Sequence, residues 1–264
     1  MVYLVAMARE KSRSKKASSG VKRAEDKKAK SRAVLKIPTA EQLLEAGVHF
    51  GHLKRRWHPK MAPFIYTDQE GVHIFDLYKT RGKLVEACQF LRKVAAEGKI
   101  IFVGTKRQSG PVIEREAGRV GAYYLSERWV GGLLTNFDSV RKNIEKLEEL
   151  SSKAKKGEFK HHTKKEQLLI EREVRKLERD IGGLRGMCEL PVAAVLASAK
   201  NEAVAAREAR QAGIPVVAIT DTNADPRLID YVVPGNDDAA ASIEIIIRTL
   251  ADAVASAKPG DKDR

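Results

Sequence analysis

Short apolar runs alternate with amphipathic segments along most of the chain. The runs at residues 100–103 and 193–196 are apolar throughout, which is typical of strands buried on both faces. Further short strands are predicted at residues 123–125, 216–219 and 231–233. Helices are predicted between and after the strands, at residues 80–97, 109–119, 201–212 and 239–255. This alternation predicts a three-layer α/β domain, Rossmann-like or flavodoxin-like, with a parallel sheet between helices.

A different pattern interrupts the alternation at residues 136–181. Apolar residues recur there every three or four positions in charged sequence, first at Phe137, Val140, Ile144, Leu147 and Leu150, then at Ile170, Val174, Leu177 and Ile181. The stretch between the two series, residues 151–163, is polar and contains Gly157. The pattern favours an antiparallel coiled-coil hairpin projecting from the sheet domain over an unrelated pair of solvated helices.

The amino-terminal part of the α/β domain contains shorter elements. Thr39 is a plausible N-cap for a helix that ends near Gly47, and strands are predicted at residues 65–66 and 73–75. The predicted organisation is a disordered basic arm at 1–36, an α/β domain at 37–135 and 182–257, the coiled-coil hairpin at 136–181, and a flexible tail at 258–264.

Positive charge is concentrated in the arm. The chain carries a net charge of +14, and residues 1–36 contain 12 Lys and Arg against 3 Asp and Glu, or +9. This asymmetry predicts a polyanion as the partner of the arm. The simpler alternative is that the charge only keeps the chain soluble. A cleaved organellar targeting segment is a third possibility, against which Glu10, Glu25 and Asp26 count.

The remaining composition indicates a reduced, non-membrane environment. Cys88 and Cys188 are one hundred residues apart with no CxxC motif, which favours reduced thiols in a cytoplasmic chain. No apolar run approaches the length of a membrane span, so no membrane partner is expected.

Two segments have the residue types of a nucleic-acid surface. Four cations surround an aromatic ring in the run Lys54, Arg55, Arg56, Trp57, His58, Pro59 and Lys60. In the string ERWVGGLLTNFD, at residues 127–138, Arg128 offers a fork for phosphate and Trp129 a stacking face. Gly131 and Gly132 would allow close backbone approach, and Thr135 or Asn136 would cap the next helix.

A nucleotide-binding α/β enzyme is the alternative that the fold raises. Gly104, Thr105 and Lys106 follow a strand, but Pro111 occupies the lysine position of a phosphate loop and GxGxxG is absent from the sequence. Lys106 and Arg107 are therefore predicted to reach RNA from a basic loop. Asp237 and Asp238, at the start of a helix, are interpreted as complementing the helix dipole.

Metal binding is a weaker alternative at two places. Asp221, Asn223 and Asp225 follow a strand and could hold magnesium, although an Asx-rich turn is favoured. His49 and His52, with His58 nearby, are spaced like metal ligands but lack a neighbouring cysteine, so hydrogen bonds to backbone or RNA contacts are favoured. No catalytic residue, metal or cofactor is predicted.

The chain resembles the family of ribosomal protein S-two, the second protein of the small ribosomal subunit, over residues 39–254. GLLTNF carries the resemblance together with four further blocks in order, at residues 43–66, 102–108, 213–226 and 229–239. The resemblance implies a non-catalytic structural constituent of the small subunit that supports translation. It implies small-subunit ribosomal RNA as partner, and neighbouring proteins that include ribosomal protein S-one.

The prediction is thus a ribosomal RNA-binding protein located in the cytoplasm, with an organellar ribosome as the alternative. The residues predicted to bind RNA are Lys54, Arg55, Arg56, Trp57, Lys60, Lys79, Arg81, Lys106, Arg107 and Arg128.

Overall fold

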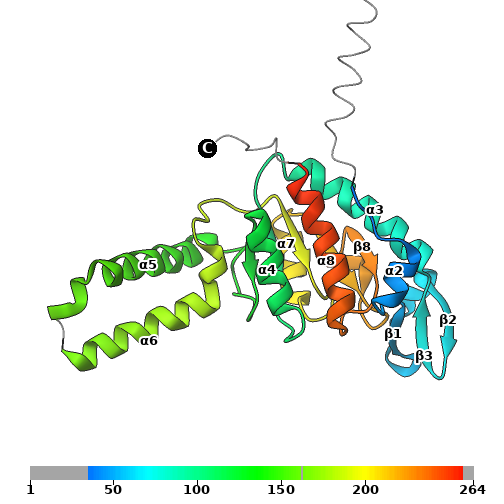
Figure 1. Cartoon of the computed structure of the whole chain (residues 1–264), viewed down its shortest axis with the longest axis horizontal. Helices are drawn as coiled ribbons and strands as arrows, with labels where there is room; N and C mark the ends of the chain where they lie inside the picture. Colours follow the sequence, from blue (N-terminus) through cyan, green and yellow to red (C-terminus); the bar gives the residue numbers. More distant parts are fainter. Residues whose placement is uncertain (1–34, 162, 258–264) are drawn as a thin grey trace, which may run out of the picture. The chain divides into compact units, whose positions relative to one another are not determined.

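A five-stranded parallel sheet in the order β5-β4-β6-β7-β8 forms the centre of the chain (Figure 1). The computed structural model describes residues 35–161 and 163–257. The strands are β4 (Ile100–Val103), β5 (Tyr123–Leu125), β6 (Ala193–Leu196), β7 (Val216–Thr220) and β8 (Tyr231–Pro234). From β4 the chain first adds β5 on one side and then β6 on the other, which is the flavodoxin-like order. The strand positions confirm the sequence prediction.

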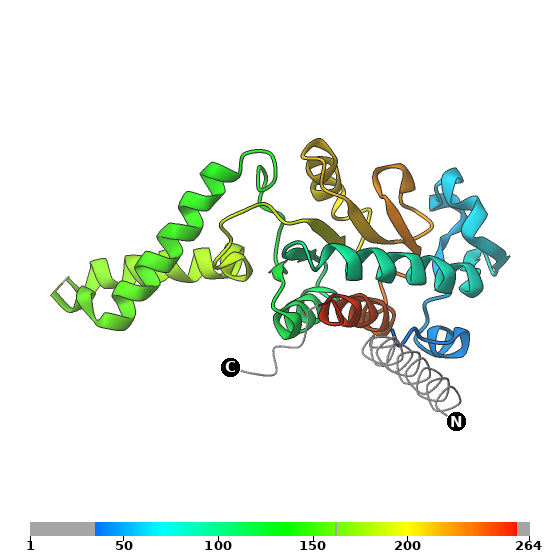
Figure 2. The same cartoon turned by 90° about the horizontal axis from the view of Figure 1, so that it is seen from above.

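Helices cover both faces of this sheet (Figure 2). One face packs against α3 (Leu77–Val94), α4 (Gly110–Val120) and α8 (Ala240–Ala255), with α8 in contact with both α3 and α4. The other face carries α7 (Ala203–Gln211), whose alanines join a core cluster with alternate residues of the strands. Because successive strand residues face opposite sides, all four residues of β4 and of β6 are buried. The three-layer α/β architecture is confirmed.

A small antiparallel sheet precedes the five-stranded sheet in the chain. It contains β1 (Phe50–Leu53), β3 (Val72–Phe75) and β2 (Ile65–Gln69) in the order β1-β3-β2. The helix before it, α2 (Ala40–Glu45), starts with the predicted cap, since Thr39 and Gln42 form a capping box. Strand β1 was not predicted. Its Gly51 is required, because an added Cβ would lie 2.6 Å from Thr222 Cγ2.

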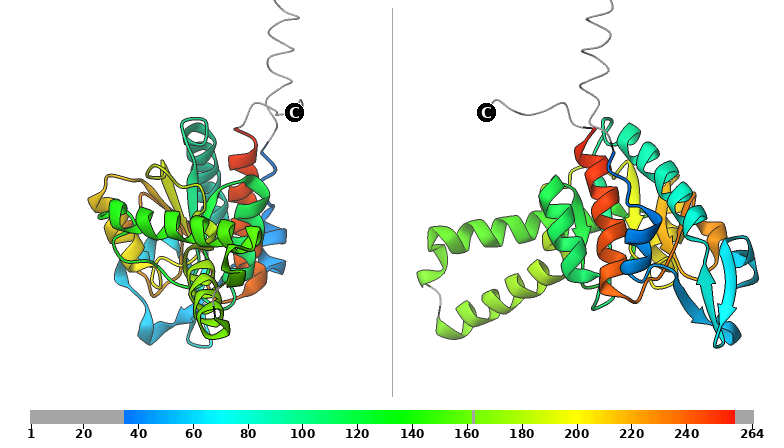
Figure 3. Two further views of the ribbon diagram at one scale, coloured as in Figure 1. Left: turned by 90° about the vertical axis from the view of Figure 1, so that its left-hand side faces the viewer. Right: turned by 45° about the vertical axis from the view of Figure 1, so that its right-hand side comes forward.

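The inserted segment forms two helices, α5 (Phe137–Lys156) and α6 (Lys164–Ile181), which lie side by side (Figure 3). Helix α5 continues about one and a half turns into the stretch predicted as a polar connection. It ends where Gly157 adopts a left-handed φ of 73°, and Thr163 forms a capping box that starts α6. Val140, Ile144 and Leu147 at the base of α5 join the core cluster of the sheet.

Five 3-10 turns connect these elements within residues 35–161 and 163–257. They are η1 (Lys54–Arg56), η2 (Pro59–Phe64), η3 (Glu158–His161), η4 (Gly182–Leu184) and η5 (Pro226–Leu228). Among the described helices, none is both long enough and apolar enough to cross a membrane. The predicted arm and tail, apart from residues 35 and 36, lie outside the described residues.

Candidate nucleic-acid interface and the carboxyl edge of the sheet

The basic loop at residues 54–60 is fixed to the carboxyl end of β7. The His58 backbone N–H donates to the Thr222 carbonyl at 2.7 Å, and the His52 N–H donates to Thr222 Oγ1 at 2.9 Å. The Trp57 ring contacts the ring of buried His73, with centroids 5.2 Å apart. These contacts anchor the backbone just before the loop and the second half of the loop, so its cationic side chains are presented from a fixed backbone.

The cations of this loop face solvent. Arg55, Arg56 and Lys60 are exposed and make no ion pair with any described residue. Lys54 pairs with exposed Asp68 at 3.3 Å, a contact that water screens. Trp57 retains 38% of its surface exposed beside them. The loop therefore offers free guanidinium and ammonium groups with an accessible aromatic face, as the sequence predicts.

Lys79 and Arg81, at the start of α3, have structural contacts. Lys79 Nζ donates to the Pro63 carbonyl at 2.7 Å, and Arg81 Nε donates to the Pro38 carbonyl at 3.3 Å. Both side chains belong to exposed residues, so these contacts leave donors available.

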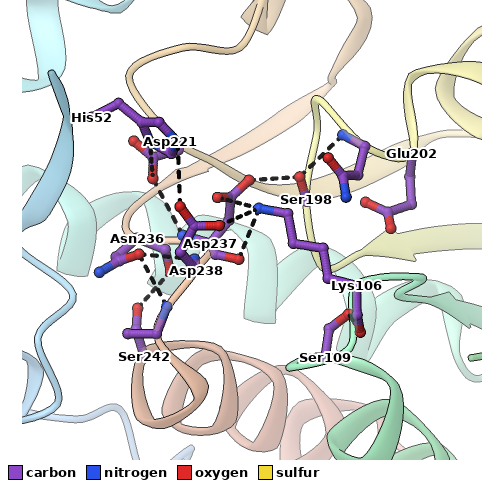
Figure 4. Close-up of polar contacts among 12 residues, drawn as sticks. His52, Lys106, Ser109, Ser198, Glu202, Asp221, Asn236, Asp237, Asp238 and Ser242 are labelled. Carbon is purple, nitrogen blue, oxygen red and sulfur yellow. Dashed lines mark hydrogen bonds and ion pairs between the residues drawn. The ribbon is translucent and has the colours of Figure 1, made fainter. Parts of the chain in front are cut away.

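Lys106 differs from the sequence prediction. Its ammonium is turned into the protein and contacts Asp237 Oδ1 at 2.6 Å and Asp238 Oδ1 at 2.8 Å (Figure 4). Burial opposes its charge, but the hydrogen bonds to the two carboxylates raise the pKa of Lys106. Asp237 is therefore an ion-pair partner, in addition to any effect on the helix dipole. The next residue, Arg107, is exposed, and it is the cation of this loop that remains accessible.

A cluster of acidic groups surrounds Lys106 at the carboxyl ends of β6, β7 and β8. Ser198 donates its hydroxyl to Asp237 Oδ2 at 2.6 Å, and Asp221 lies beside Asp237 (Figure 4). Burial, together with the charge of Asp221, raises the pKa of Asp237. Burial likewise raises the pKa of Glu202, which accepts hydrogen bonds from the Thr105 backbone and hydroxyl.

His52 links the small sheet to this cluster. Its Nδ1 lies 3.0 Å from Asp221 Oδ2, and its Nε2 lies 3.3 Å from Asp238 Oδ2. The hydrogen bond with Asp221 raises the pKa of the His52 imidazole. Of the two interpretations favoured for His52, a hydrogen bond to backbone was wrong, because its side-chain partners are carboxylates, and an RNA contact stays a prediction. His49 has a buried Nδ1 without a hydrogen-bond partner among the described residues.

The same cluster occupies the place where a flavodoxin-like fold binds a ligand. That place is the crevice at the carboxyl ends of the strands where the order reverses, here between β4 and β6. The Lys106 ammonium and the Ser198 hydroxyl, from the two loops that line this point, both bind Asp237. A phosphate would have to compete with this buried carboxylate for its cation, so the arrangement does not favour a nucleotide.

The Asx turn predicted after β7 is confirmed at Asp225. Its carboxylate accepts from the Arg227 backbone N–H at 3.1 Å and pairs with the Arg227 guanidinium. The hydrogen bonds from Arg227 lower the pKa of Asp225 to about 2.

Arg128 and Trp129 leave the carboxyl end of β5 in different environments. Arg128 pairs with Asp180 at 2.8 Å, yet its side chain is 64% exposed. Trp129 is half-buried and donates its indole N–H to Glu208 on α7 at 2.9 Å. The same carboxylate accepts from the backbone N–H groups of Gly132 and Leu134. Sequence reasoning missed Glu208, which lies 79 residues away in an alanine-rich helix.

The glycines of this loop have a different role from the predicted one. An added Cβ at Gly131 would meet nothing within 4 Å, so no close backbone approach requires that glycine. Gly132 has a φ of 82°, the left-handed conformation that glycine adopts without strain. Asn136 occupies the N-cap position of α5, but its side chain makes no capping hydrogen bond.

Comparison with known proteins identifies relatives over most of the chain. The profile of the family described as Ribosomal protein S2 matches residues 43–257. The "Small ribosomal subunit protein uS2c" of Guillardia theta is 46% identical over 223 residues, which cover 84% of this chain and 95% of the relative. The protein of the same name from Rhodomonas salina is 44% identical over 225 residues, covering 85% of this chain and 93% of the relative.

Proposed function

Because the chain belongs to the ribosomal protein S2 family, we propose that it binds small-subunit ribosomal RNA and supports translation as part of the ribosome. Proteins of this family are structural components of the small subunit and not enzymes. The proposal therefore concerns which surface of this chain meets RNA.

One observation carries the choice of surface: accessible cations from three separate segments of the chain lie at the carboxyl edge of the sheet. The basic loop is fixed to the end of β7 through His58, while Arg107 follows β4 and Arg128 follows β5. Half or more of protein–nucleic acid hydrogen bonds go to phosphate and sugar, and arginine forks suit phosphate. We assign Arg55, Arg56, Lys60, Arg107 and Arg128 to phosphate contacts, and Trp57 to stacking on a base.

Lys54, Lys79 and Arg81 are proposed as further RNA contacts that also have a structural role. Each also holds a protein group, namely the Asp68 carboxylate or the carbonyls of Pro63 and Pro38. Lys106 is left out of the proposed surface because its ammonium is held by Asp237 and Asp238.

We further infer that the α5–α6 hairpin is a coiled-coil insertion within the α/β domain. Lys146 Nζ contacts Glu173 Oε1 across the pair at 2.5 Å, and Val174 and Leu177 pack against the core cluster. The base of the hairpin is thus continuous with the core, and its distal part is the arm. The family resemblance also implies ribosomal protein S-one as a partner, and we propose that it docks on the α/β domain.

A double substitution in the basic loop tests the RNA surface. Arg55→Ala with Arg56→Ala removes two exposed cations that make no ion pair with any described residue, so folding should be unaffected. The variant should bind small-subunit ribosomal RNA more weakly at low salt. It should also lose about 1.4–1.8 units of the slope of log K against log salt, because each phosphate contact contributes about 0.7–0.9.

The matched control is Lys93→Ala with Lys155→Ala, which removes two exposed cations from helices α3 and α5. It should reproduce the wild-type affinity and slope in the same filter-binding titration. Equal slopes for the loop variant and the wild-type protein would reject the loop as the RNA contact.

A further inference from the structure

We propose that His73 is a further RNA-binding residue, covered by Trp57 in the free protein and uncovered when Trp57 turns to stack on an unpaired base. The ligand is an unpaired RNA nucleotide, whose base stacks on the indole and whose phosphate accepts a hydrogen bond from the imidazole. The inference rests on the proposed RNA binding by the basic loop at residues 54–60. It adds a contact from strand β3, which lies beneath this loop.

The His73 imidazole is buried without a hydrogen bond. It is 6% exposed, and neither Nδ1 nor Nε2 has a partner among the described residues. A neutral imidazole carries one donor and one acceptor, so both are unmet. An apolar ring fills such a position without this cost, as Phe75 does two residues further along the same face of β3. Packing alone therefore does not explain a histidine at this position.

Trp57 packs against His73, but no hydrogen bond to a described residue holds its indole there. The two ring centroids are 5.2 Å apart, and the ring planes are inclined by 52°. The indole N–H of Trp57 donates to no atom of the described residues. Trp129 differs, since its indole N–H donates to Glu208 at 2.9 Å. Rotation of the Trp57 side chain thus breaks no such hydrogen bond, whereas rotation of Trp129 would break one.

The indole is accessible to a base before it turns. Trp57 is 38% exposed, and the backbone next to it is held by the hydrogen bond from the His58 N–H to the Thr222 carbonyl. A change of the side-chain rotamer is therefore sufficient, and the loop backbone can stay in place. Stacking on a base replaces the packing of the indole on His73. Bases in a duplex already stack on one another, so the base must be unpaired.

Cations on both sides of Trp57 attract phosphate to this loop. Arg55 and Arg56 precede the indole and Lys60 follows it, and all three are exposed and make no ion pair with any described residue. An imidazole that Trp57 no longer covers can donate its N–H to a phosphate oxygen of the bound nucleotide. The donor that is unmet in the free protein is then satisfied.

Filter binding of the full chain to a transcript of small-subunit ribosomal RNA tests the inference. His73→Phe keeps a ring against Trp57 but removes both nitrogens. It should bind the RNA about tenfold more weakly, as expected for one lost hydrogen bond to a charged group, while its urea midpoint stays the same or rises. Trp57→Ala should weaken binding about tenfold through lost stacking, and His73→Phe in that background should weaken it about tenfold again.

Oligoribonucleotides test the kind of ligand. The wild-type chain should prefer a single-stranded oligoribonucleotide to the duplex of the same sequence, because only the single strand offers a free base face. Trp57→Ala should lose this preference. An equal preference in the two proteins would overturn the assignment of an unpaired base to Trp57.

The control is His161→Phe, which makes the same replacement at an exposed histidine on η3 and should keep the wild-type affinity. Wild-type affinity in His73→Phe would overturn the inference, and so would a joint loss of affinity and stability, which would make His73 a structural residue. If Arg55→Ala with Arg56→Ala still weakens binding in that case, the proposed RNA surface stands without His73. If that double variant also binds like the wild-type protein, the loop is not the RNA surface.

Discussion

The indole of Trp129 and the carboxylate of Glu208 are joined by a hydrogen bond of 2.9 Å between Nε1 and Oε1. The same carboxylate accepts from two backbone N–H groups of the loop, those of Gly132 and Leu134. One side chain of α7 therefore fixes both the aromatic residue and the backbone at the entry to α5. This contact sets the position from which Arg128 reaches the surface.

Replacement of Glu208 should loosen this loop. In Glu208→Gln the oxygen can keep the Trp129 contact, but the amide NH₂ would face the Leu134 N–H, which then lacks an acceptor. The expected loss is about 1–3 kcal/mol in the free energy of unfolding, since an unsatisfied buried donor costs about this much. Urea unfolding followed by tryptophan fluorescence measures it. Glu145→Gln, at a side chain that is 58% exposed, is the control and should change little. Equal losses in the two variants would contradict the role of Glu208.

The two ends of the hairpin should respond differently to truncation of a leucine. Leu147, at the base, is 0% exposed and belongs to the core cluster, whereas Leu169, toward the tip, is 55% exposed. Leu147→Ala should cost about 2–5 kcal/mol through lost burial and the cavity left behind. Leu169→Ala should cost less than about 0.5 kcal/mol. Denaturant unfolding of both variants compares them, and similar losses would show that the base does not share the core.

The sheet was predictable because its strands carry a strong local signal. Ile100 to Val103 and Ala193 to Leu196 are uninterrupted apolar runs, and a parallel sheet buried on both faces requires such runs. Strand β1 was missed for the opposite reason. Phe50 to Leu53 contains a glycine and a histidine, and the strand forms through pairing with β3 and contact with Thr222, which the local sequence does not encode.

The candidate site also contains some features that the local sequence predicts and others that only the fold creates. Exposure of Arg55, Arg56 and Trp57 follows from their presence in one short basic loop, so composition was sufficient to predict it. The partners of Lys106 could not be predicted, because Asp237 is 131 residues away and meets it only where parallel strands bring their carboxyl ends together. His52 and Asp221 meet for the same reason. Pairings made by the topology of the sheet leave no spacing pattern in the sequence.

A buried glutamate should make stability depend on acid pH. Glu116 on α4 contacts Arg115 at 3.0 Å and Arg119 at 2.7 Å, and these arginines pair with Glu244 and Asp252 of α8. Burial alone would raise the pKa of Glu116, but the hydrogen bonds and charges of the two arginines lower it below its usual value. A lowered folded-state pKa means that ionised Glu116 stabilises the protein fully above its unfolded pKa. That stability is lost as the pH falls through the folded value.

Glu116→Gln should therefore destabilise the protein near neutral pH by about 1–3 kcal/mol and flatten its acid dependence between about pH 5 and 3. Urea midpoints measured across this range give the comparison. Glu171→Gln, at a side chain that is 68% exposed, should keep the wild-type dependence. If the urea midpoint of Glu116→Gln changed with pH as steeply as that of the wild-type protein, other carboxylates would dominate acid unfolding.

The basic amino-terminal segment should contribute to RNA affinity through its charge. Residues 1–36 carry +9 of the net +14, and they lack the apolar periodicity that core packing requires. Deletion of residues 2–34 should weaken binding to small-subunit ribosomal RNA most strongly at low salt, because fewer counterions are released, while the thermal midpoint stays close to that of the full chain. Equal RNA affinity at low salt would exclude this role. The alternative is that the segment is a targeting sequence that is cleaved off. Intact-mass measurement of the protein taken from ribosomes tests it, since a cleaved protein would lack the mass of the segment.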